Sequence, residues 1–335
     1  MSRWFRIVAP IGALLLLASG GLAAAGWWWL AQPLPLPASP YTFEVRAGSS
    51  LRHVARDLAA AGIVPGELPL VALARLRALD RTIKAGNYEI ASGITLPQLL
   101  DRLTQGDVLQ TAWTVIEGAT FADVRRALRA DPGVTKTLLD LPDAELMRRI
   151  GAAGGSAEGW FFPETYFFVT GSTDAALLAR AYRLMRARLD GAWERRAPDL
   201  PLGEPYDALI LASIVEKETG AGADRPLIAS VYLNRLRLRM RLQADPTVIY
   251  GMGTGFDGNL RRRDLETDTP WNTYTRDGLP PTPIALPGQA SLDAVTHPAK
   301  TSYLYFVARG DGTSEFSTNL ADHNRAVAKY QRGAR

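Results

Sequence analysis

A long uncharged stretch near the N-terminus constrains the fold of this chain more than any other feature. Residues 7–31 (IVAPIGALLLLASGGLAAAGWWWLA) contain no Asp, Glu, Lys or Arg. As a helix rising about 1.5 Å per residue they would extend roughly 37 Å, which is enough to cross a bilayer. Arg3 and Arg6 precede the stretch, and the next basic residue is Arg46. The positive-inside rule therefore predicts a cytoplasmic N-terminus and an exported remainder.

The alternative is a cleaved signal peptide, because small residues at 23–26 would suit a peptidase. The length of the stretch and the tryptophans at 27–29, which favour the headgroup level, support a retained anchor instead. We therefore expect residues 1–31 to form a cytoplasmic tip and a single-pass transmembrane helix in the inner (cytoplasmic) membrane, with the rest of the chain in the periplasm. Residues 32–40 (QPLPLPASP) are expected to form an extended, proline-rich linker.

The composition excludes several classes of protein. The 335 residues include no cysteine, which rules out disulfides, thiolate zinc sites and a lipid-modified N-terminal cysteine. His53, His297 and His323 are too widely spaced to form a metal-binding motif, so we expect no metal and no cofactor. The net charge of +4 suits an anionic partner such as membrane phosphate, although it also serves solubility. Export argues against a nucleic-acid partner.

One short pattern occurs three times between residues 44 and 128. Each copy has a glycine (Gly48, Gly93 or Gly118), a hydroxyl residue at +2 and apolar residues at +3, +6 and +10. A strand that ends at a glycine turn, followed by a Ser- or Thr-capped helix with one buried face, explains these positions. Such elements also recur by chance, but agreement at five offsets favours a shared unit. Residues 41–107, with the first two copies, resemble the small β-α-α-β LysM module, which implies affinity for N-acetylated glycans.

Residues 108–335 are expected to form a larger mixed α+β catalytic domain, which makes the predicted fold class of the chain α+β. Within this domain, residues 206–220 (YDALILASIVEKETG) predict a buried helix. Residues 208–215 at its centre contain a single polar group, Ser213.

The spacing in this helix singles out Glu218. The residues three, four and seven positions before it are Val, Ile and Leu, so its carboxyl is expected on the apolar side of the helix. Glu216 is turned about 200° away and is expected to face solvent together with Ser213. Burial raises the pKa of a carboxyl, as a general acid near neutral pH requires. The competing interpretation is that EKE near a helix end is a solvated face.

A series of longer motifs carries a resemblance to a known family. Between residues 158 and 324 the chain contains, in order, EGWFFPETY, IVEKETG, VYLNRL, RLQADPTVIYGMG, DLETDTPWNTYTRDGLPPTPIALPG, HPAKTSYLYFV and FSTNLADHN. These resemble the signatures of the YceG-like family, and with the anchor and the LysM-like unit the resemblance covers nearly the whole chain. It implies an endolytic peptidoglycan lytic transglycosylase, a lyase that cleaves the β-1,4 bond between MurNAc and GlcNAc and leaves 1,6-anhydroMurNAc ends.

The resemblance also assigns the acid/base, because the second Glu of the family's E-K-E-T motif is Glu218 here. It implies that Glu218 protonates the glycosidic oxygen and then accepts a proton from the muramic C6 hydroxyl as that hydroxyl attacks the anomeric carbon. No water enters, so the second catalytic carboxylate of most glycosidases is not required. The implied role is to terminate the elongation of nascent glycan strands, beside penicillin-binding synthases.

Other residues are candidates for binding the sugar. They offer amides, carboxylates and an aromatic ring that match sugar hydroxyls, acetamides and pyranose faces, and they are Gln243, Asp245, Asn272, Tyr274 and Glu158. The alternative is that Asp245 caps the turn at Pro246 and that the aromatic residues at 160–162 belong to the core. Asn319 and His323 are weaker candidates.

One position departs from the family pattern. Relatives commonly have glycine before the Met of this segment, where the chain has Arg239 in RLRLRMRLQ. If the backbone there takes a positive φ, an arginine strains the turn. The arginines at 235, 237, 239 and 241 either contact stem-peptide carboxylates or lipid phosphates, or form a solvated edge, which is the simpler expectation.

Three other functions stay open at this point. They are a glycan-binding scaffold without activity, a hydrolase of the same bond and a serine peptidase. The peptidase is the least favoured, because no nucleophile-elbow motif surrounds Ser213 and neither downstream histidine has a recognisable partner.

Overall fold

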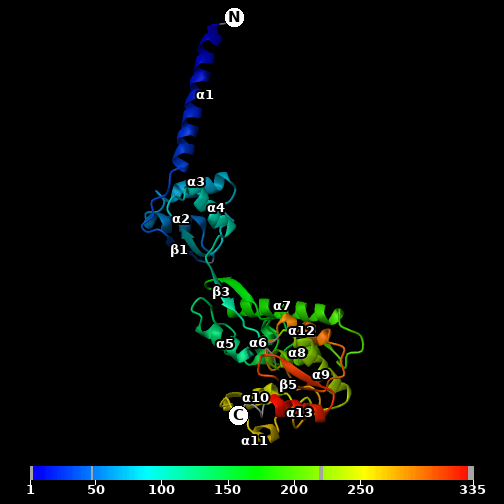
Figure 1. Ribbon diagram of the computed structural model, residues 1–335. Helices are drawn as coiled ribbons and strands as arrows, with labels where there is room; N and C mark the ends of the chain where they lie inside the picture. Colours follow the sequence, from blue (N-terminus) through cyan, green and yellow to red (C-terminus); the bar gives the residue numbers. More distant parts are fainter. Residues whose placement is uncertain (1–2, 47, 219–221, 331–335) are drawn as a thin grey trace. The chain divides into compact units, whose positions relative to one another are not determined.

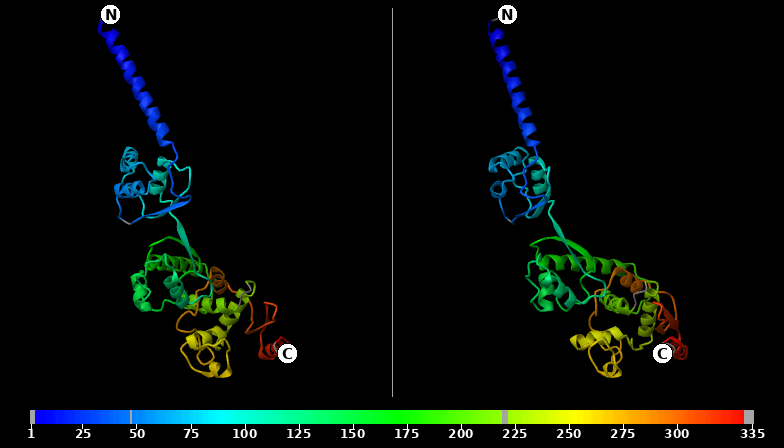
Figure 2. Two further views of the ribbon diagram at one scale, coloured as in Figure 1. Left: turned by 90° about the vertical axis from the view of Figure 1, so that its left-hand side faces the viewer. Right: turned by 60° about the vertical axis from the view of Figure 1, so that its left-hand side comes forward.

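The chain divides into two compact units in the computed structural model (Figure 1 and Figure 2). The structure describes residues 3–46, 48–218 and 222–330, and for residues 3–15 it describes the backbone alone. The small unit comprises Met1–Thr111 with Val169–Gly171, and the large unit comprises Ala112–Phe168 with Ser172–Arg335. The unit boundary at Thr111 lies four residues beyond the domain boundary expected at residue 107.

The N-terminal stretch forms helix α1 (Arg3–Leu30). Among the residues whose side chains are described, no helix has both the length and the apolarity needed to cross a membrane. The predicted anchor at 7–31 falls partly on residues 3–15, whose side chains lie outside the described residues. The anchor therefore stays a prediction.

The proline-rich segment that follows α1 packs on the small unit, although its composition predicted an extended linker. The Leu34 amide donates a hydrogen bond of 2.8 Å to the carbonyl of Ile94, and the Leu34 side chain belongs to the core of the small unit. Pro33 forms a bridge with Thr95. Burial of a leucine placed between two prolines accounts for the difference, because an extended polyproline segment has no internal hydrogen bonds to lose.

The small unit contains a two-stranded sheet covered by three helices. Its elements, in chain order, are β1 (Tyr41–Val45), α2 (Leu51–Ala60), α3 (Glu67–Leu76), β2 (Gly86–Ile90) and α4 (Leu96–Gln105). Strands β1 and β2 are antiparallel, with Tyr41 opposite Ile90 and Val45 opposite Gly86. The order from β1 to β2 is therefore β-α-α-β, with α4 added at the end.

The predicted repeat is confirmed in all three copies. Gly48, Gly93 and Gly118 have φ values of 80°, 92° and 75°, in the left-handed region that favours glycine. The Ser50 and Thr120 hydroxyls accept hydrogen bonds from the third amide of α2 and of α5 (Phe121–Ala130). The nine apolar side chains at +3, +6 and +10 are buried: Leu51, Val54, Leu58, Leu96, Leu99, Leu103, Phe121, Val124 and Leu128. The third copy lies in the large unit.

The large unit is mixed α+β, in agreement with the predicted fold class. Its strands form two two-stranded sheets, one of β3 (Gln110–Thr114) with β4 (Thr165–Val169) and one of β5 (Tyr305–Ala308) with β6 (Ser314–Ser317). The described helices after α5 are α6 (Asp143–Arg149), α7 (Asp174–Glu194), α8 (Pro205–Glu218), α9 (Arg225–Arg237), α10 (Asp245–Met252), α11 (Arg262–Glu266), α12 (Gln289–Thr296) and α13 (Leu320–Tyr330).

Helix α8 lies at the centre of the large unit, packed against α7, α9 and α12 (Figure 1). Residues 208–215 of this helix are all buried, as their composition predicted. A helix enclosed on all sides is a rigid support for the residue at its end, which is Glu218.

Candidate active site

Glu218 is the last residue of α8, and its carboxyl is held by a hydroxyl from α9. The Tyr232 hydroxyl donates a hydrogen bond of 2.5 Å to Glu218 Oε1. Tyr232 itself is buried, with its ring edge-on to Phe306 of β5. Two consecutive helices and a strand that is distant in the sequence therefore fix the position of one carboxyl.

The surroundings of Glu218 oppose its ionisation. Burial is the main cause, and together with the negative charge of Asp245 it raises the pKa of Glu218 from 4.5 to about 7. The hydrogen bond from Tyr232 and the positive charge of Arg235 act in the opposite direction. The raised pKa favours a protonated carboxyl near neutral pH, as a group that first donates and then accepts a proton requires.

Glu218 opens into a cavity of about 490 Å³ between α8, α9, α13 and β5. This volume lies within the range of small-ligand sites. The polar side chains on its wall are those of Glu218, Tyr232, Arg235, Gln243, Asp245, Tyr274, Tyr305, Ser314, His323 and Asn324.

Three of the predicted sugar-binding residues line this cavity. Gln243 is exposed and has a φ of 50°, so its backbone is in the left-handed region. Asp245 is the first residue of α10, and its carboxylate accepts a hydrogen bond of 2.5 Å from the Tyr274 hydroxyl. The loop between α9 and α10 and the turn before Tyr274 thus face Glu218 together.

Asn272 does not line the cavity, because its amide is used inside the protein. The side chain is fully buried, and its Nδ2 donates to the carbonyls of Leu265 and Thr267 at 3.0 and 2.7 Å. Its Oδ1 accepts from the Tyr274 amide at 2.8 Å. Asn272 therefore holds the turn that carries Tyr274, and the predicted contact with sugar does not fit this geometry.

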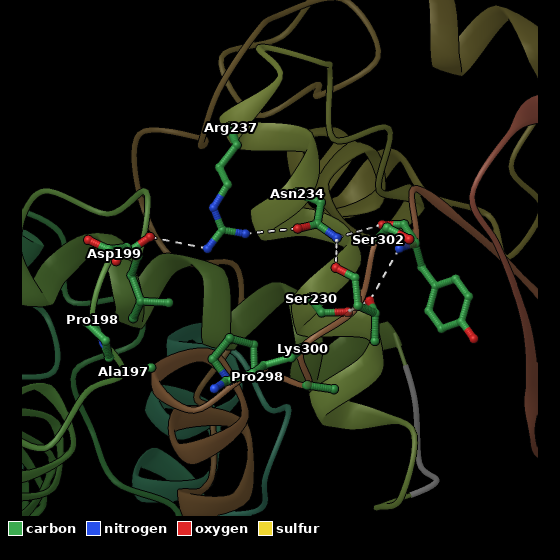
Figure 3. Close-up of a pocket in the computed structure, with 13 residues that line it drawn as sticks. Ala197, Pro198, Asp199, Ser230, Asn234, Arg237, Pro298, Lys300 and Ser302 are labelled. Carbon is green, nitrogen blue, oxygen red and sulfur yellow. Dashed lines mark hydrogen bonds between the residues drawn. The ribbon is translucent and has the colours of Figure 1, made fainter.

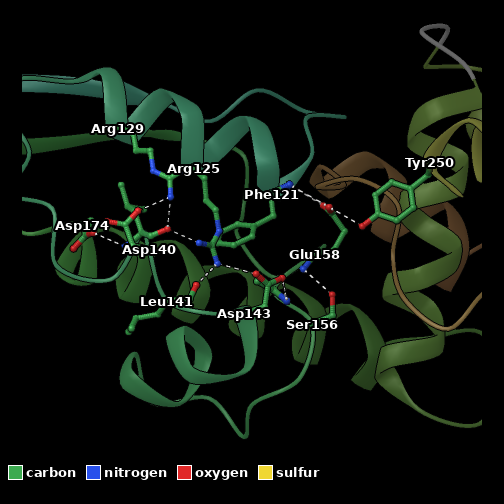
Figure 4. Close-up of polar contacts among 12 residues, drawn as sticks. Phe121, Arg125, Arg129, Asp140, Leu141, Asp143, Ser156, Glu158, Asp174 and Tyr250 are labelled. Carbon is green, nitrogen blue, oxygen red and sulfur yellow. Dashed lines mark hydrogen bonds and ion pairs between the residues drawn. The ribbon is translucent and has the colours of Figure 1, made fainter. Parts of the chain in front are cut away.

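Glu158 does not line the cavity either, and Figure 4 shows it between Phe121 and Tyr250. Its buried carboxyl accepts from the Phe121 amide at 3.0 Å and from the Tyr250 hydroxyl at 3.1 Å. Burial raises the pKa of Glu158 to about 7. The carboxyl links the first turn of α5 to α10, so the predicted sugar contact is replaced by a bridge within the large unit. Its neighbours Phe161 and Phe162 are core residues.

The prediction that Glu216 and Ser213 face solvent is wrong. The Glu216 carboxylate accepts from the Gly288 amide at 2.9 Å and the Ser291 hydroxyl at 2.7 Å, and it lies 3.2 Å from the Arg225 guanidinium. Ser213 is fully buried, and its hydroxyl accepts a hydrogen bond from the backbone amide of Ile284, in the loop before α12. Helix α12 covers this face of α8, which helical spacing within α8 alone could not reveal.

Arg235 was expected at a solvated edge, and the structure places it in the wall of the cavity. It is buried, donates to the carbonyls of Leu304 and Leu242 at 2.7 and 2.6 Å, and lies over the ring of Tyr305. Spacing within α9 could not reveal this, because residues 228–233 are buried on every side of the helix and no single apolar face marks the position of Arg235.

Tyr232, Tyr305 and His323 complete the wall. Neither tyrosine was a predicted site residue, and His323 was only a weaker candidate. The His323 ring stacks on that of Tyr305 with centroids 5.2 Å apart. Burial, followed by the charge of Arg235, lowers the pKa of His323. Tyr232 lies in the motif VYLNRL and Tyr305 in HPAKTSYLYFV. A tyrosine in each of these motifs is the sequence feature that could have identified them.

Comparisons with known proteins agree with this architecture. The model of the YceG-like family matches residues 43–329. The chain belongs to the YceG-like family. It is 31% identical over 305 residues to the endolytic murein transglycosylase of Bacillus subtilis strain 168, covering 85% of this chain and 83% of the relative. It is 28% identical over 324 residues to the endolytic murein transglycosylase of Streptococcus pneumoniae strain D39, covering 86% of this chain and 58% of that one.

A solved structure is also similar. The crystal structure of a yceG-like protein from Listeria monocytogenes has a TM-score of 0.53 and 27% identity, covering 86% of this chain and 98% of the other. The likeness therefore extends over both units of a YceG-like protein, beyond the motifs around Glu218.

Proposed function

We propose that this protein is an endolytic peptidoglycan lytic transglycosylase. It cleaves the β-1,4 bond between MurNAc and GlcNAc and leaves 1,6-anhydroMurNAc ends. The observation that carries the proposal is a carboxyl, Glu218, whose pKa is raised to about 7 at the wall of a cavity large enough for sugar residues. Relatives at 31% and 28% identity are named endolytic murein transglycosylases.

In this reaction Glu218 acts twice. Its protonated form donates to the glycosidic oxygen, and the C1–O bond breaks as the GlcNAc hydroxyl leaves. The resulting carboxylate accepts the proton of the muramic C6 hydroxyl while that oxygen bonds to C1 and closes the anhydro ring. The carboxyl ends as it began, so one residue completes the cycle without water.

The other groups in the cavity support this step. Tyr232 holds Glu218 in place, and the Tyr232 hydrogen bond and the charge of Arg235 stabilise its ionised form between the two proton transfers. Gln243 and the Tyr274 ring offer amide and aromatic contacts to the sugar. The negative charge of Asp245 lies where it can stabilise positive charge that develops on the ring in the transition state.

The presence of Asp245 favours one second candidate, a hydrolase of the same bond. A second carboxylate facing the acid is the arrangement with which most glycosidases activate water or form a covalent intermediate. The two functions differ in their products, since hydrolysis adds one water that the anhydro sugar lacks.

The test is digestion of purified sacculi followed by mass spectrometry of the released fragments. The unmodified protein is expected to release anhydro-ended fragments, and Glu218→Gln to lower the rate by about a thousandfold. Glu194→Gln, at an exposed glutamate at the end of α7, is the matched control and keeps full activity. Release by Glu218→Gln at the normal rate would reject the mechanism, and fragments heavier by one water would identify a hydrolase.

We also propose where the protein works. Residues 7–31 would anchor it in the inner membrane, with the catalytic unit in the periplasm close to nascent strands and to penicillin-binding synthases. The support is the uncharged stretch with Arg3 and Arg6 before it. Carbonate extraction should leave the full chain in the membrane pellet and release a variant that lacks residues 7–31. Release of the full chain would argue against the anchor.

A further inference from the structure

A second cavity of about 750 Å³ lies on the large unit, on a different face of α9 from the catalytic cavity. Ser230, Asn234 and Arg237 of α9 line this second cavity, whereas Tyr232 and Arg235 line the first. Figure 3 shows Arg237 reaching between Asn234 and the segment at 197–200, with residues 298–303 closing the other side. None of the residues assigned to catalysis lines it.

The guanidinium of Arg237 is held in place by neutral groups. It donates to Asn234 Oδ1 at 2.9 Å and to the carbonyl of Asp199 at 3.2 Å. Asn234 is fixed in turn, because its Nδ2 donates to the carbonyls of Thr301 and Tyr303. Asp199 presents its carbonyl from a backbone with a φ of 62°, which is uncommon outside glycine. These contacts orient the charge of Arg237 without neutralising it.

A second cation lines the same cavity. Lys300 is exposed, and within the described part of the chain neither Lys300 nor Arg237 forms an ion pair. The exposed carboxylate of Asp199 and the hydroxyl of Ser302 complete the polar wall. An oriented guanidinium and a free ammonium in one cavity bind carboxylates well, because the guanidinium supplies two parallel donors and the ammonium a compact charge.

We infer that this cavity binds the carboxylates of the peptide attached to the glycan strand. The inference rests on the proposed function for the identity of the polymer. Arg237 and Lys300 bind the carboxylates, and Asp199 pairs with the free amine of a diamino acid in the same peptide. A cavity of this volume accommodates a short peptide.

The test measures binding separately from cleavage. The full chain carrying Glu218→Gln is titrated with the free stem tripeptide of peptidoglycan in a calorimeter, and with the same peptide after amidation of its carboxylates. Arg237→Gln and Lys300→Gln should each weaken binding of the unmodified peptide about tenfold, while Arg183→Gln, at an exposed arginine of α7, should leave it unchanged. Equal binding of the amidated and unmodified peptides would overturn the inference.

Two further arms separate the possible outcomes. In the active chain, Arg237→Gln should raise KM for intact strands but not for strands stripped of peptide by an amidase. Vesicles rich in anionic lipid provide the second arm. If they bind in a way that depends on Arg237 and Lys300, and the peptide does not bind, the cavity is assigned to phosphate and the inference is overturned. If the peptide binds but the active chain does not cut glycan, the proposed function fails, whereas the assignment of this cavity to peptide carboxylates is upheld.

Thermal unfolding checks that each variant folds. If Arg237→Gln does not fold, Lys300→Gln provides the test.

Discussion

At the scale of single residues, the site is a balance of charges around one carboxyl. Burial and Asp245 favour the protonated form of Glu218, whereas Tyr232 and Arg235 favour the ionised form. Tyr232 and Arg235 lie on α9 and Asp245 on α10, so each can be changed without altering α8. The pKa of Glu218 should therefore move in opposite directions when partners of opposite effect are removed.

The pH profile tests this balance. Because the protonated form of Glu218 starts the reaction, kcat/KM is expected to be highest below pH 7 and to fall as the pH rises through about 7. Asp245→Asn removes a charge that raises the pKa of Glu218, so this fall should move to lower pH. Tyr232→Phe removes a hydrogen bond that lowers the pKa, so the fall should move to higher pH. Shifts in the same direction for both variants would contradict the charge balance.

The sequence predicted Glu218 and three residues that line the cavity with it, but not the parts played by Tyr232, Arg235 and Glu216. Spacing along α8 places Glu218 correctly because the positions before it are part of one continuous apolar face. It fails for Glu216, since the partner that covers Glu216 is α12, more than seventy residues later. Tyr232 and Arg235 were missed for the same reason, because their role depends on which helix packs against α8. Spacing along a helix predicts the direction of a side chain but not the element that packs against it.

At the scale of elements, the end of α9 carries a strained residue. The amide of Arg239 donates to the carbonyl of Leu236 and that of Met240 to the carbonyl of Arg235, the two bonds of a Schellman motif. Arg239 occupies the position where this motif prefers glycine and has a φ of 54°, which confirms the conditional expectation from the sequence.

Arg239→Gly should therefore stabilise the large unit by about 1 kcal/mol, because it removes the clash of a Cβ atom in the left-handed region. Urea unfolding at pH 7 measures the change. Arg239→Ala is the control, since it removes the charge but keeps the Cβ atom and should give no gain. Equal stabilisation by alanine and glycine would show that charge, and not backbone strain, is relieved.

The bridge between α5 and α10 makes stability depend on pH. The pKa of the Glu158 carboxyl is about 7 in the folded protein, against an ordinary value of 4.5. The folded protein thus binds this proton more tightly, and stability falls as the pH rises from about 4.5 to about 7. Glu158→Gln keeps the hydrogen bonds without a charge, so at pH 8 it should be more stable than the unmodified protein by roughly 1–3 kcal/mol.

The same comparison at pH 4 provides the control, because there both proteins are uncharged at position 158 and should be equally stable. Glu158→Ala leaves the Phe121 amide without its acceptor and should destabilise at both pH values by roughly 1–3 kcal/mol. A Gln variant that is less stable than the unmodified protein at pH 8 would mean that the ionised carboxylate is favoured in the fold.

At the scale of the whole molecule, the repeat predicted local structure better than unit boundaries. All three copies form a strand, a glycine turn and a capped helix, because the turn and the helix cap depend only on residues that are close in the sequence. The third copy belongs to the large unit, on the side of the expected boundary where it was placed, but β3 crosses the unit boundary at Thr111. The partner of β3 is β4, some fifty residues later, and no local pattern identifies it.

The resemblance of residues 41–107 to the LysM module predicts that the small unit binds glycan. A variant without residues 41–107 should then lose most of its binding to sacculi, measured by co-sedimentation of the Glu218→Gln chain. Cleavage of short, soluble strands by the corresponding active variant should continue, because Glu218 and the residues around it lie in the large unit. Undiminished co-sedimentation would rule out this role.

Because of the hydrogen bond from Tyr232 to Glu218, the ionisation of Glu218 can be followed by ultraviolet absorbance. A phenol that donates to a carboxylate absorbs at longer wavelength than one beside a neutral carboxyl, so the near-ultraviolet spectrum records the ionisation directly. The chain has 11 tyrosines and 8 tryptophans, but subtraction of the Tyr232→Phe spectrum isolates one ring. The absorbance of Tyr232 therefore reports the ionisation of Glu218, which can be titrated in the absence of any polymer.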